Sequence, residues 1–495
     1  MSLLSTLQNS IQDNFENNAF FLNDVFYSYK DFAQEISNIR AVLKKKTKKN
    51  ELNIGLVSNN DVQTYASIIA LWMEGKAYVP LNPEFPIERN TSIIKQAEIL
   101  TILDSSKSII YSGHQTILTK KLDQTKIDLT PNEFLNDALA YILFTSGTTG
   151  VSKGVPITFG NLAGLTDAFW ELNYPYNNQD KCLQMFELTF DFSVMAYLFP
   201  LLKGACIYTI PKDQIKYSYI YELMEDHGLT ILPMVPSILH YLRPYFNEIL
   251  CENVKLSLFC GEALPLDITE EWSNCIPNAS IANVYGPTEC TVFCTDYTYK
   301  RGANNKTDNG ILSVGKDMKN TVTIIVDDNN NEVPTGEKGE LCLSGSQLTP
   351  GYWKNEEKNK EVFFYKEKNG SETRFYRTGD LCRIDEDGDI LYLGRVDFQA
   401  KIQGFRVELS EIEFHAKQAI EKTNIAAIAF PNNLNNTTEV GLVIESEKFE
   451  TNDLLDYMKK KMPQYMIPSQ IRFIDSFPLN TNGKTDRNKL KNLFN

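Results

Sequence analysis

Short β-rich runs alternate with amphipathic stretches along the first 300 residues, and this alternation constrains the fold more than any other feature of the chain. Apolar runs that are too short for helices, followed by segments with a helical period, are typical of βα units on a largely parallel sheet. The sequence therefore predicts an α/β fold. The expected pairs of strand and helix are 52–58 with 61–74, 181–186 with 192–203 and 229–234 with 237–246, followed by strands at 256–260 and 280–285.

The pattern changes to strands and turns from about residue 320, where Asp387-Gly388 predicts a hairpin between strands at 381–384 and 390–393. After Asp397 comes a compact α+β segment, with helices expected at 409–420 and 453–462 and strands at 426–430, 440–445 and 470–475. We predict layered αβ sheets in an N-terminal core at 1–396, which includes a β-rich subdomain at about 320–396. A small mobile C-terminal domain at 397–495 follows, and Gly394–Phe398 forms the boundary.

Composition excludes several classes of protein. The net charge of −14 disfavours binding to a phosphate backbone, and no run of about 18 apolar residues predicts a membrane span. The first fifteen residues turn polar too soon for a signal peptide. Nine cysteines without a CxxC pair argue for reduced thiols rather than disulfides or zinc. We expect a cytoplasmic monomer that neither binds nucleic acid nor inserts into a membrane.

A Gly/Ser/Thr loop carrying one lysine follows the apolar strand at 140–144. Glycines let the backbone approach an anion, hydroxyls donate to phosphate oxygens, and Lys153 supplies a positive charge. Ser152 and Gly154 replace the second glycine and the hydroxyl of a Walker A loop, which argues against a P-loop ATPase. The alternative is a plain glycine-rich turn.

Six motifs in order resemble those of the adenylate-forming superfamily, which includes amino-acid adenylation domains, acyl-CoA synthetases and luciferases. Ser152 stands where this family usually has proline, so the difference concerns loop rigidity. The motifs are Ala77–Pro83 (AYVPLNP), Thr145–Gly154 (TSGTTGVSKG), Asn283–Glu289 (NVYGPTE), Tyr376–Asp380 (YRTGD), Gly394–Glu408 (GRVDFQAKIQGFRVE) and Asn482–Arg487 (NGKTDR).

The resemblance implies attack of a carboxylate on the α-phosphate of ATP and then acyl transfer to a thiol. It assigns Tyr285 to adenine, Asn283 to the base edge, Asp380 to the ribose hydroxyls, Thr288 to the α-phosphate and Glu289 to Mg²⁺. In isolation, Asn283, Thr288 and Asp380 could equally be turn residues. The remaining residues assigned to ATP are Thr145, Ser146, Gly147, Thr148, Thr149, Gly150, Lys153, Glu262, Gly286 and Arg395.

Three further positions take their roles from the resemblance. Lys484 is the lysine that reaches the carboxylate and the α-phosphate during adenylation, so it serves both substrate binding and catalysis. Asp397 falls at the hinge, and Gly404 lines the tunnel for a phosphopantetheine arm after the small domain rotates.

The substrate is expected to be an amino acid. Phe190–Met195 (FDFSVM) resembles the FDxSV motif, whose aspartate binds the substrate ammonium, and this assigns Asp191. The alternative for Asp191 is a helix N-cap. Leu258–Pro265 (LFCGEALP), together with FDFSVM and the stretch GRVDFQAKIQGFRVELSEIEFH, most resembles the freestanding D-alanine–D-alanyl carrier protein ligases. The other expected pocket walls are Phe192, Met195, Pro233, Leu258, Cys260, Val284, Val292 and Phe293.

D-alanine is the first candidate substrate, but Phe192 and Phe293 are bulky for such a ligase, so glycine, serine and L-alanine remain open. The chain ends eight residues after Arg487, which suggests that a separate carrier protein supplies the thiol in trans. The lysine run Lys459–Lys461 is expected either to end a helix or to bind a carrier protein that is acidic. Other candidates are an acyl-CoA synthetase of the same fold, an adenylation enzyme of nonribosomal peptide synthesis and a catalytically silent homologue.

Overall fold

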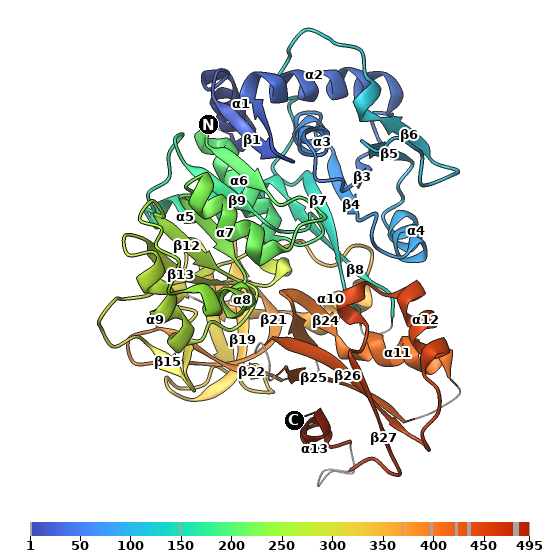
Figure 1. Ribbon diagram of the computed structural model, residues 1–495, viewed down its shortest axis with the longest axis vertical. Coiled ribbons are helices and arrows are strands. Elements are labelled where there is room, and N and C mark those ends of the chain that lie inside the picture. The colour runs from blue at the N-terminus through green and yellow to red at the C-terminus, as the bar shows by residue number, and fades with distance from the viewer. Residues whose placement is uncertain are drawn as a thin grey trace. The chain divides into compact units, whose positions relative to one another are not determined.

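The computed structural model (Figure 1) describes residues 2–147, 150–368, 370–396, 399–420, 424–432, 437–478 and 485–494. The chain forms two compact units. The first unit comprises Met1–Asn82, Ala97–Leu143 and Gly154–Val396. The second comprises Pro83–Gln96, Phe144–Lys153 and Asp397–Asn495. The predicted glycine-rich loop thus belongs to the same unit as the C-terminal segment.

A nine-stranded sheet carries most of the candidate site in the first unit. Its central strands pair in parallel, and antiparallel strands close both edges. The order is β17 (Lys316–Asp317), β14 (Thr295–Thr298), β13 (Ser280–Tyr285), β12 (Leu256–Phe259), β11 (Ile231–Met234), β9 (Lys181–Gln184), β10 (Cys206–Thr209), β1 (Asn18–Leu22) and β2 (Val25–Ser28). The carboxyl ends of parallel strands are where ligands bind in α/β sheets, and β12 and β13 end at the predicted motifs.

A six-stranded sheet holds the glycine-rich loop between its last two strands. Its order is β6 (Gln115–Leu118), β5 (Thr101–Asp104), β3 (Asn53–Val57), β4 (Ala77–Leu81), β7 (Leu139–Thr145) and β8 (Lys153–Thr158). The helix α3 (Val62–Met73) packs on β3 and β4, and α2 (Tyr29–Lys46) packs on α3, as Figure 1 shows.

The helices of the first unit follow their sequence signals. Ser28 and Thr158 form capping boxes at the starts of α2 and α5 (Phe159–Glu171). The helix α6 (Phe192–Lys203) is buried along nearly its whole length and ends at Gly204, whose φ is 74°. The other helices are α1 (Leu3–Asp13), α7 (Lys216–Asp226), α8 (Ser237–Leu242), α9 (Leu266–Cys275) and α10 (Glu356–Val362).

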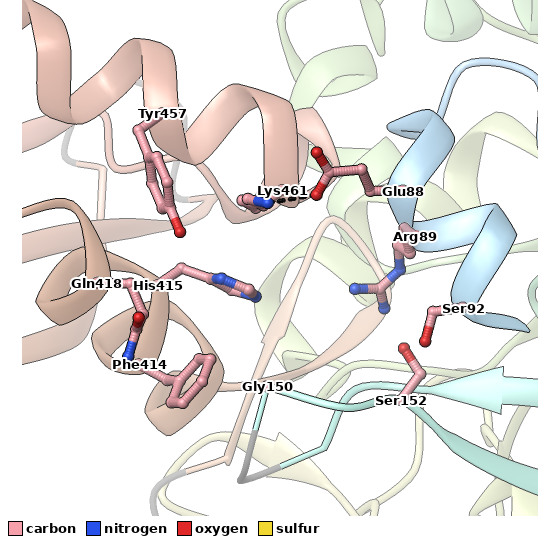
Figure 2. A pocket seen from close by; sticks show the side chains of 10 residues that line it. All are labelled: Glu88, Arg89, Ser92, Gly150, Ser152, Phe414, His415, Gln418, Tyr457 and Lys461. Carbon is pink, nitrogen blue, oxygen red and sulfur yellow. Dashed lines mark hydrogen bonds and ion pairs between the residues drawn. The ribbon is translucent and has the colours of Figure 1, made fainter. Parts of the chain in front are cut away.

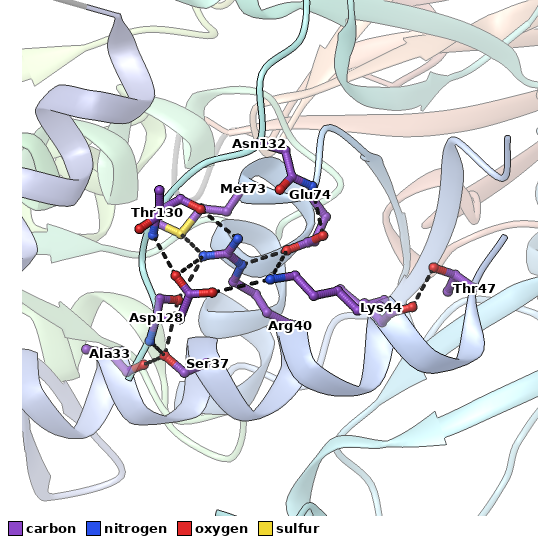
Figure 3. A network of polar contacts seen from close by, with 11 residues as sticks. Ala33, Ser37, Arg40, Lys44, Thr47, Met73, Glu74, Asp128, Thr130 and Asn132 are labelled. Carbon is purple, nitrogen blue, oxygen red and sulfur yellow. Dashed lines mark hydrogen bonds and ion pairs between the residues drawn. The ribbon is translucent and has the colours of Figure 1, made fainter. Parts of the chain in front are cut away.

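A buried arginine holds the segment before β7 against α2 and α3 (Figure 3). Arg40 donates to the carboxylate of Glu74 at 2.7 Å and to the carbonyl oxygens of Asp128 at 2.8 Å and Thr130 at 2.7 Å. Lys44 lies 3.2 Å from the Asp128 carboxylate. Because Arg40 and Glu74 are both buried, this network pairs charges that would otherwise be costly in the interior.

A five-stranded antiparallel sheet covers 321–395. It contains β18 (Thr321–Val326), β19 (Lys338–Gly345), β20 (Phe363–Lys368), β21 (Ser371–Ile384) and β22 (Ile390–Arg395). The hairpin predicted at Asp387-Gly388 is confirmed, because β21 and β22 pair across it and Gly388 has a φ of 85°.

The second unit has its own apolar core, in which α11 (Leu409–Ala419) and α12 (Asn452–Lys461) pack together with a three-stranded sheet. The sheet consists of β25 (Ile425–Pro431), β26 (Thr438–Glu445) and β27 (Gln470–Ile474). The hairpin of β23 (Gln399–Ile402) and β24 (Phe405–Glu408) precedes α11, and α4 (Ile87–Gln96) and α13 (Arg487–Lys491) complete the unit.

The predicted α/β fold is confirmed, and most of the expected strands and helices occur within a few residues of their predicted bounds. The strand expected at 381–384 is longer than predicted, because β21 already begins at Ser371. One helix is shorter than predicted. The stretch expected at 237–246 ends as an α-helix at Leu242 and continues as the 3-10 turn Arg243–Tyr245. Pro244 lacks the backbone N–H that the next α-helical turn requires. The division into domains at 396 stays a prediction.

Candidate functional site

Tyr285 and Asp380, predicted to bind adenine and ribose, are in direct contact. Tyr285 ends β13 and Asp380 lies in β21, and the Tyr285 hydroxyl donates to Oδ2 of Asp380 at 2.5 Å. Both side chains are buried. Burial and the nearby Asp380 charge raise the pKa of the Tyr285 phenol well above its ordinary value, so the phenol stays protonated and remains a donor.

Arg395 joins this pair because the register of β21 and β22 places it opposite Asp380. Its guanidinium donates to Oδ1 of Asp380 at 2.8 Å and to the carbonyl oxygen of Thr378 at 2.9 Å. The hairpin thus places the guanidinium beside the carboxylate, and the end of β13 adds the phenol. Together these groups can serve the ring and hydroxyls of a nucleoside.

Asn283 and Glu262 have structural partners. Asn283 lies in β13 rather than in a turn, and its Nδ2 donates to the carbonyl oxygen of Ser313 at 2.9 Å. Glu262 accepts from the backbone N–H of Ser237 at 2.7 Å and so caps the start of α8. These contacts leave their predicted roles in ATP binding as predictions.

Glu289 lies in the turn Thr288–Cys290 and is fully buried. The hydroxyl of Tyr352 donates to its Oε1 at 2.5 Å, and the hydroxyl of Tyr376 lies 3.3 Å from that of Tyr352. In the described part of the chain, no three His, Cys, Asp or Glu side chains gather as a metal cage. Mg²⁺ typically takes one or two carboxylates together with substrate phosphates, so a single buried carboxylate fits this ion.

The glycine-rich loop belongs to the second unit and is tightly folded. The N–H of Gly150 donates to the carbonyl oxygen of Gly147 at 3.1 Å, and Gly150 has a φ of 76°. A Cβ on Gly147 would lie 2.0 Å from the carbonyl oxygen of Val151. Glycine is therefore required at both positions. Thr148 and Thr149 lie outside the described residues.

Two carboxylates of the C-terminal segment contact this loop. Lys153 Nζ lies 3.0 Å from Oε1 of Glu408, and the N–H of Gly147 donates to Oε2 of Glu411 at 3.1 Å. The Ser146 hydroxyl donates to the carbonyl oxygen of Arg406 at 2.8 Å. The loop's amide and lysine thus bind anions, which is the property that a phosphate loop needs.

A cavity of about 250 Å³ opens beside the loop in the same unit (Figure 2). Arg89 reaches into it from α4 and pairs with the buried Glu411 at 2.6 Å, and Lys461 pairs with Glu88. His415 also lines the cavity. Burial lowers the pKa of His415, and the positive charges of Arg89 and Lys461 lower it further, against the opposing effect of Glu411. Of the residues that line it, Gly150 and Ser152 belong to a quoted motif, whereas the motifs did not indicate Arg89 or His415.

Asp191 occupies the N-cap position of α6, but its side chain makes no capping hydrogen bond. The carboxylate therefore does not have the capping role that was the alternative to substrate binding. It is buried, and its charge raises the pKa of the Tyr78 and Tyr141 phenols, although burial is the main cause of both shifts. The carboxylate therefore lies close to these two rings.

The predicted pocket walls cluster beside α6. Phe192, Met195, Leu258, Cys260, Val284, Val292 and Phe293 belong to one buried apolar core, and Pro233 is buried on β11. The rings of Phe192 and Phe293 meet edge to face with centroids 6.2 Å apart. Phe186 packs on Phe192 with centroids 4.8 Å apart. Three aromatic rings therefore pack together at the predicted pocket.

Other predicted positions have simple local settings. Gly404 occupies the two-residue turn between β23 and β24 with a φ of 85°. Lys461 ends α12, as expected for the lysine run. Asp397 and Lys484 lie outside the described residues. The sequence did not indicate Tyr352, Glu408 or Glu411 as site residues, although Glu408 closes a quoted motif.

Among the residues that the structure describes, no helix combines the length and apolar character that crossing a bilayer requires.

Comparison with known proteins assigns the chain to a family. Residues 7–353 match the family model described as AMP-binding enzyme. The chain is 31% identical over 444 residues to tyrocidine synthase 3 of Brevibacillus parabrevis, covering 88% of this chain and 7% of that protein. It is 29% identical to the D-alanine–D-alanyl carrier protein ligase of Bacillus licheniformis, covering 99% of both.

The first four curated relatives are much longer proteins, and the chain spans only 7–17% of their length. Among solved structures, the Vibrio cholerae adenylation domain AlmE in complex with glycyl-adenosine-5'-phosphate superposes with a TM-score of 0.87 at 24% identity. That match covers 99% of this chain and 97% of AlmE, and it shows a shared fold. The chain belongs to the AMP-binding enzyme family, whose related members are adenylate-forming ligases and synthetases.

Proposed function

We propose that the protein activates a small amino acid with ATP and transfers it to the phosphopantetheine thiol of a separate carrier protein, with D-alanine as the first candidate. The observation that supports this proposal is the buried Asp191 carboxylate at the start of α6, next to the residues predicted to line the amino-acid pocket. A carboxylate there suits an ammonium group, which plain fatty or aryl acids lack.

In the first step, a carboxylate oxygen of the amino acid attacks the α-phosphorus of ATP, the bond to the bridging oxygen breaks, and pyrophosphate leaves. Tyr285, Asp380 and Arg395 would hold the nucleoside. Lys153 and the amide of Gly147 would hold phosphate oxygens once they exchange their carboxylate partners. Such preorganised cations and donors stabilise charge that develops in the transition state.

Glu289 would hold Mg²⁺, which neutralises phosphate charge when bound. Lys484 would reach the substrate carboxylate and the α-phosphate in this step. In the second step, the carrier's thiolate sulfur attacks the acyl carbon, the bond from that carbon to the AMP oxygen breaks, and AMP leaves. Gly404 would line the path of the pantetheine arm, and Asp397 would serve as the hinge.

Glycine is a second candidate substrate. The edge-to-face contact of Phe192 with Phe293, together with the neighbouring Met195, would narrow the predicted pocket. AlmE, a relative of the same fold, was solved with a glycyl adenylate. Serine, L-alanine, an adenylation role within nonribosomal peptide synthesis, and an acyl-CoA synthetase remain the alternatives.

The nine cysteines are free thiols, and eight of them are buried. This supports the proposed cytoplasmic setting.

Amino-acid-dependent exchange of labelled pyrophosphate into ATP tests the proposal, using D- and L-alanine, glycine, serine and large aromatic amino acids. We expect D-alanine or glycine to give the fastest exchange. Preference for an aromatic amino acid would overturn the assignment of a small substrate. A second assay compares a phosphopantetheinylated carrier with free coenzyme A, and efficient use of coenzyme A would favour the acyl-CoA synthetase alternative.

A further inference from the structure

The turn that joins Glu289 to the pocket wall is held in an unusual backbone conformation. Thr291 has a φ of 48° and Val292 has a φ of 72°. Such positive values are rare for residues other than glycine, and for a β-branched residue they are true outliers. A conformation of this kind persists only where the surrounding structure enforces it, and it concentrates at functional sites.

Gln347 is the side chain that encloses this turn. It is fully buried, and its Nε2 donates to the carbonyl oxygen of Phe293 at 2.7 Å. The same nitrogen lies 3.4 Å from the carbonyl oxygens of Cys290 and Thr291. In return, the Thr291 hydroxyl donates to the backbone carbonyl of Gln347 at 2.5 Å.

The turn is also closed from the other side. A Cβ on Gly286 would lie 2.4 Å from Cα of Phe293, so the backbone of Phe293 packs directly on this glycine. Phe293 is therefore fixed between Gly286 and the Gln347 amide. Its ring contacts that of Phe192 edge to face at the predicted pocket.

Residues 346–352, which we call the brace, are themselves anchored. Asn161 Nδ2 donates to the carbonyl oxygens of Ser346 at 2.9 Å and Leu348 at 3.0 Å. Further along the brace, the N–H of Thr349 donates to the carbonyl oxygen of Glu289 at 2.8 Å, and Tyr352 binds the Glu289 carboxylate. One short segment thus contacts both ends of the turn.

We propose that Gln347 is a positioning residue for amino-acid selectivity, and this inference rests on the proposed function. A larger substrate side chain would need the Phe293 ring to retreat. The hydrogen bond from Gln347 to the Phe293 carbonyl prevents that movement, because it ties the wall to a brace anchored on α5. Selectivity for a small substrate then comes from the rigidity of the Phe293 wall as well as from the bulk of its ring.

Gln347→Met tests this proposal, because it keeps the length of the side chain and removes the donor. The ratio of kcat/KM for D-alanine and glycine to that for D- and L-leucine is measured by pyrophosphate exchange. We expect that ratio to fall at least about tenfold, because excluding one or two extra methylenes from an apolar pocket changes kcat/KM by about this factor. KM for ATP should change less than about twofold. Gln34→Met is the matched control, because Nε2 of Gln34 also donates to a backbone carbonyl, that of Thr125, and neither residue is among the predicted pocket residues.

Thr291→Val is the second variant, and it removes only the hydroxyl that bonds to Gln347. We expect the selectivity ratio to fall in this variant too, but by less. Thr291→Val keeps the test valid if Gln347→Met folds poorly. A lower melting temperature with an unchanged selectivity ratio in both variants would overturn the proposal and leave Gln347 a structural residue. If the wild-type protein exchanges pyrophosphate with no amino acid, the proposed function fails and this inference fails with it.

Discussion

The hydroxyl of Tyr285 and the carboxylate of Asp380 lie 2.5 Å apart, and this contact joins two sheets of the first unit at the predicted nucleoside site. The two residues are 95 positions apart in the chain. Because Arg395 binds the other carboxylate oxygen, Asp380 is oriented from both sides. A ligand hydroxyl would therefore meet a carboxylate that is already fixed in place.

Asp380→Asn should raise KM for ATP. The substitution keeps the shape of the side chain but removes the charge that Tyr285 and Arg395 bind. A hydrogen bond to a charged group contributes about 1.5–3 kcal/mol, so KM for ATP should rise roughly 10- to 150-fold. Pyrophosphate exchange at varied ATP concentration measures the effect. Tyr285→Phe, which keeps the ring, should cost less. Equal KM values for ATP in Asp380→Asn and wild type would remove Asp380 from the nucleotide site.

Lys153→Met should lower kcat/KM for ATP about 100-fold, because the loop would lose its cation while the phosphates keep their charge. Glu408→Gln should lower KM for ATP, because it frees Lys153 from the carboxylate that it binds within the protein. Lys120→Met is the control, because Lys120 forms an ion pair of similar length, with Asp61 at 2.8 Å, although its side chain is more exposed. A weaker apparent affinity for ATP in Glu408→Gln would contradict the idea that the two anions compete.

Asp191→Asn should raise KM for the amino acid by about 10- to 100-fold and leave KM for ATP nearly unchanged. The substrate ammonium loses its counter-charge, whereas the nucleotide contacts stay intact. Exchange kinetics with one substrate varied at a time separate the two constants. An equal rise in both constants would show that Asp191 supports the whole site rather than the ammonium.

Asp296 makes stability depend on pH. Burial raises the pKa of its carboxyl to about 6, although the Tyr174 hydroxyl donates to it at 2.7 Å and opposes the shift. Because the pKa is raised in the folded state, the folded form binds the proton more tightly. Its contribution to stability is present below the unfolded pKa near 4 and is lost as the pH rises through 6.

Asp296→Asn should therefore be more stable than wild type at pH 7, by an amount of the order of 2–3 kcal/mol, and equally stable near pH 4. Urea unfolding of both proteins at the two pH values gives this difference. A pH-independent difference would show that the carboxyl does not titrate differently in the folded state.

Arg40→Met should destabilise the first unit by about 3–5 kcal/mol, because it leaves the buried Glu74 carboxylate without its guanidinium (Figure 3). Urea unfolding measures the loss, and adding Glu74→Gln should recover part of it. Lys44→Met is the control. Lys44 is 45% exposed, so its removal should change the free energy of unfolding by less than about 1 kcal/mol.

Local patterns predicted the local structure well. The helix α6 has its predicted bounds, because a continuous apolar stretch ends at Gly204 and that residue adopts the left-handed cap. The strand β13 also matches its prediction. The helix predicted from Ser237 ends early, just before Pro244. This proline is a local signal, but the prediction used only the apolar periodicity.

Contacts between distant segments could not be predicted from the sequence. Gln347 carries no motif, and its role depends on a turn some 54 residues earlier in the chain. Glu411 reaches the glycine-rich loop across 264 positions. Hydrogen bonds of this kind follow from tertiary packing, and a residue pattern over ten or twenty positions contains no information about them.

The glycine-rich loop already holds anions supplied by its own chain. A nucleotide can enter such a loop only by exchange, so its apparent affinity reports the difference between two sets of ionic contacts rather than the strength of one. Phosphate analogues too weak to displace a tethered carboxylate would be rejected, although each could form every contact that the loop offers. The ionic competition inside the protein would thereby act as a threshold on the ligands that gain access.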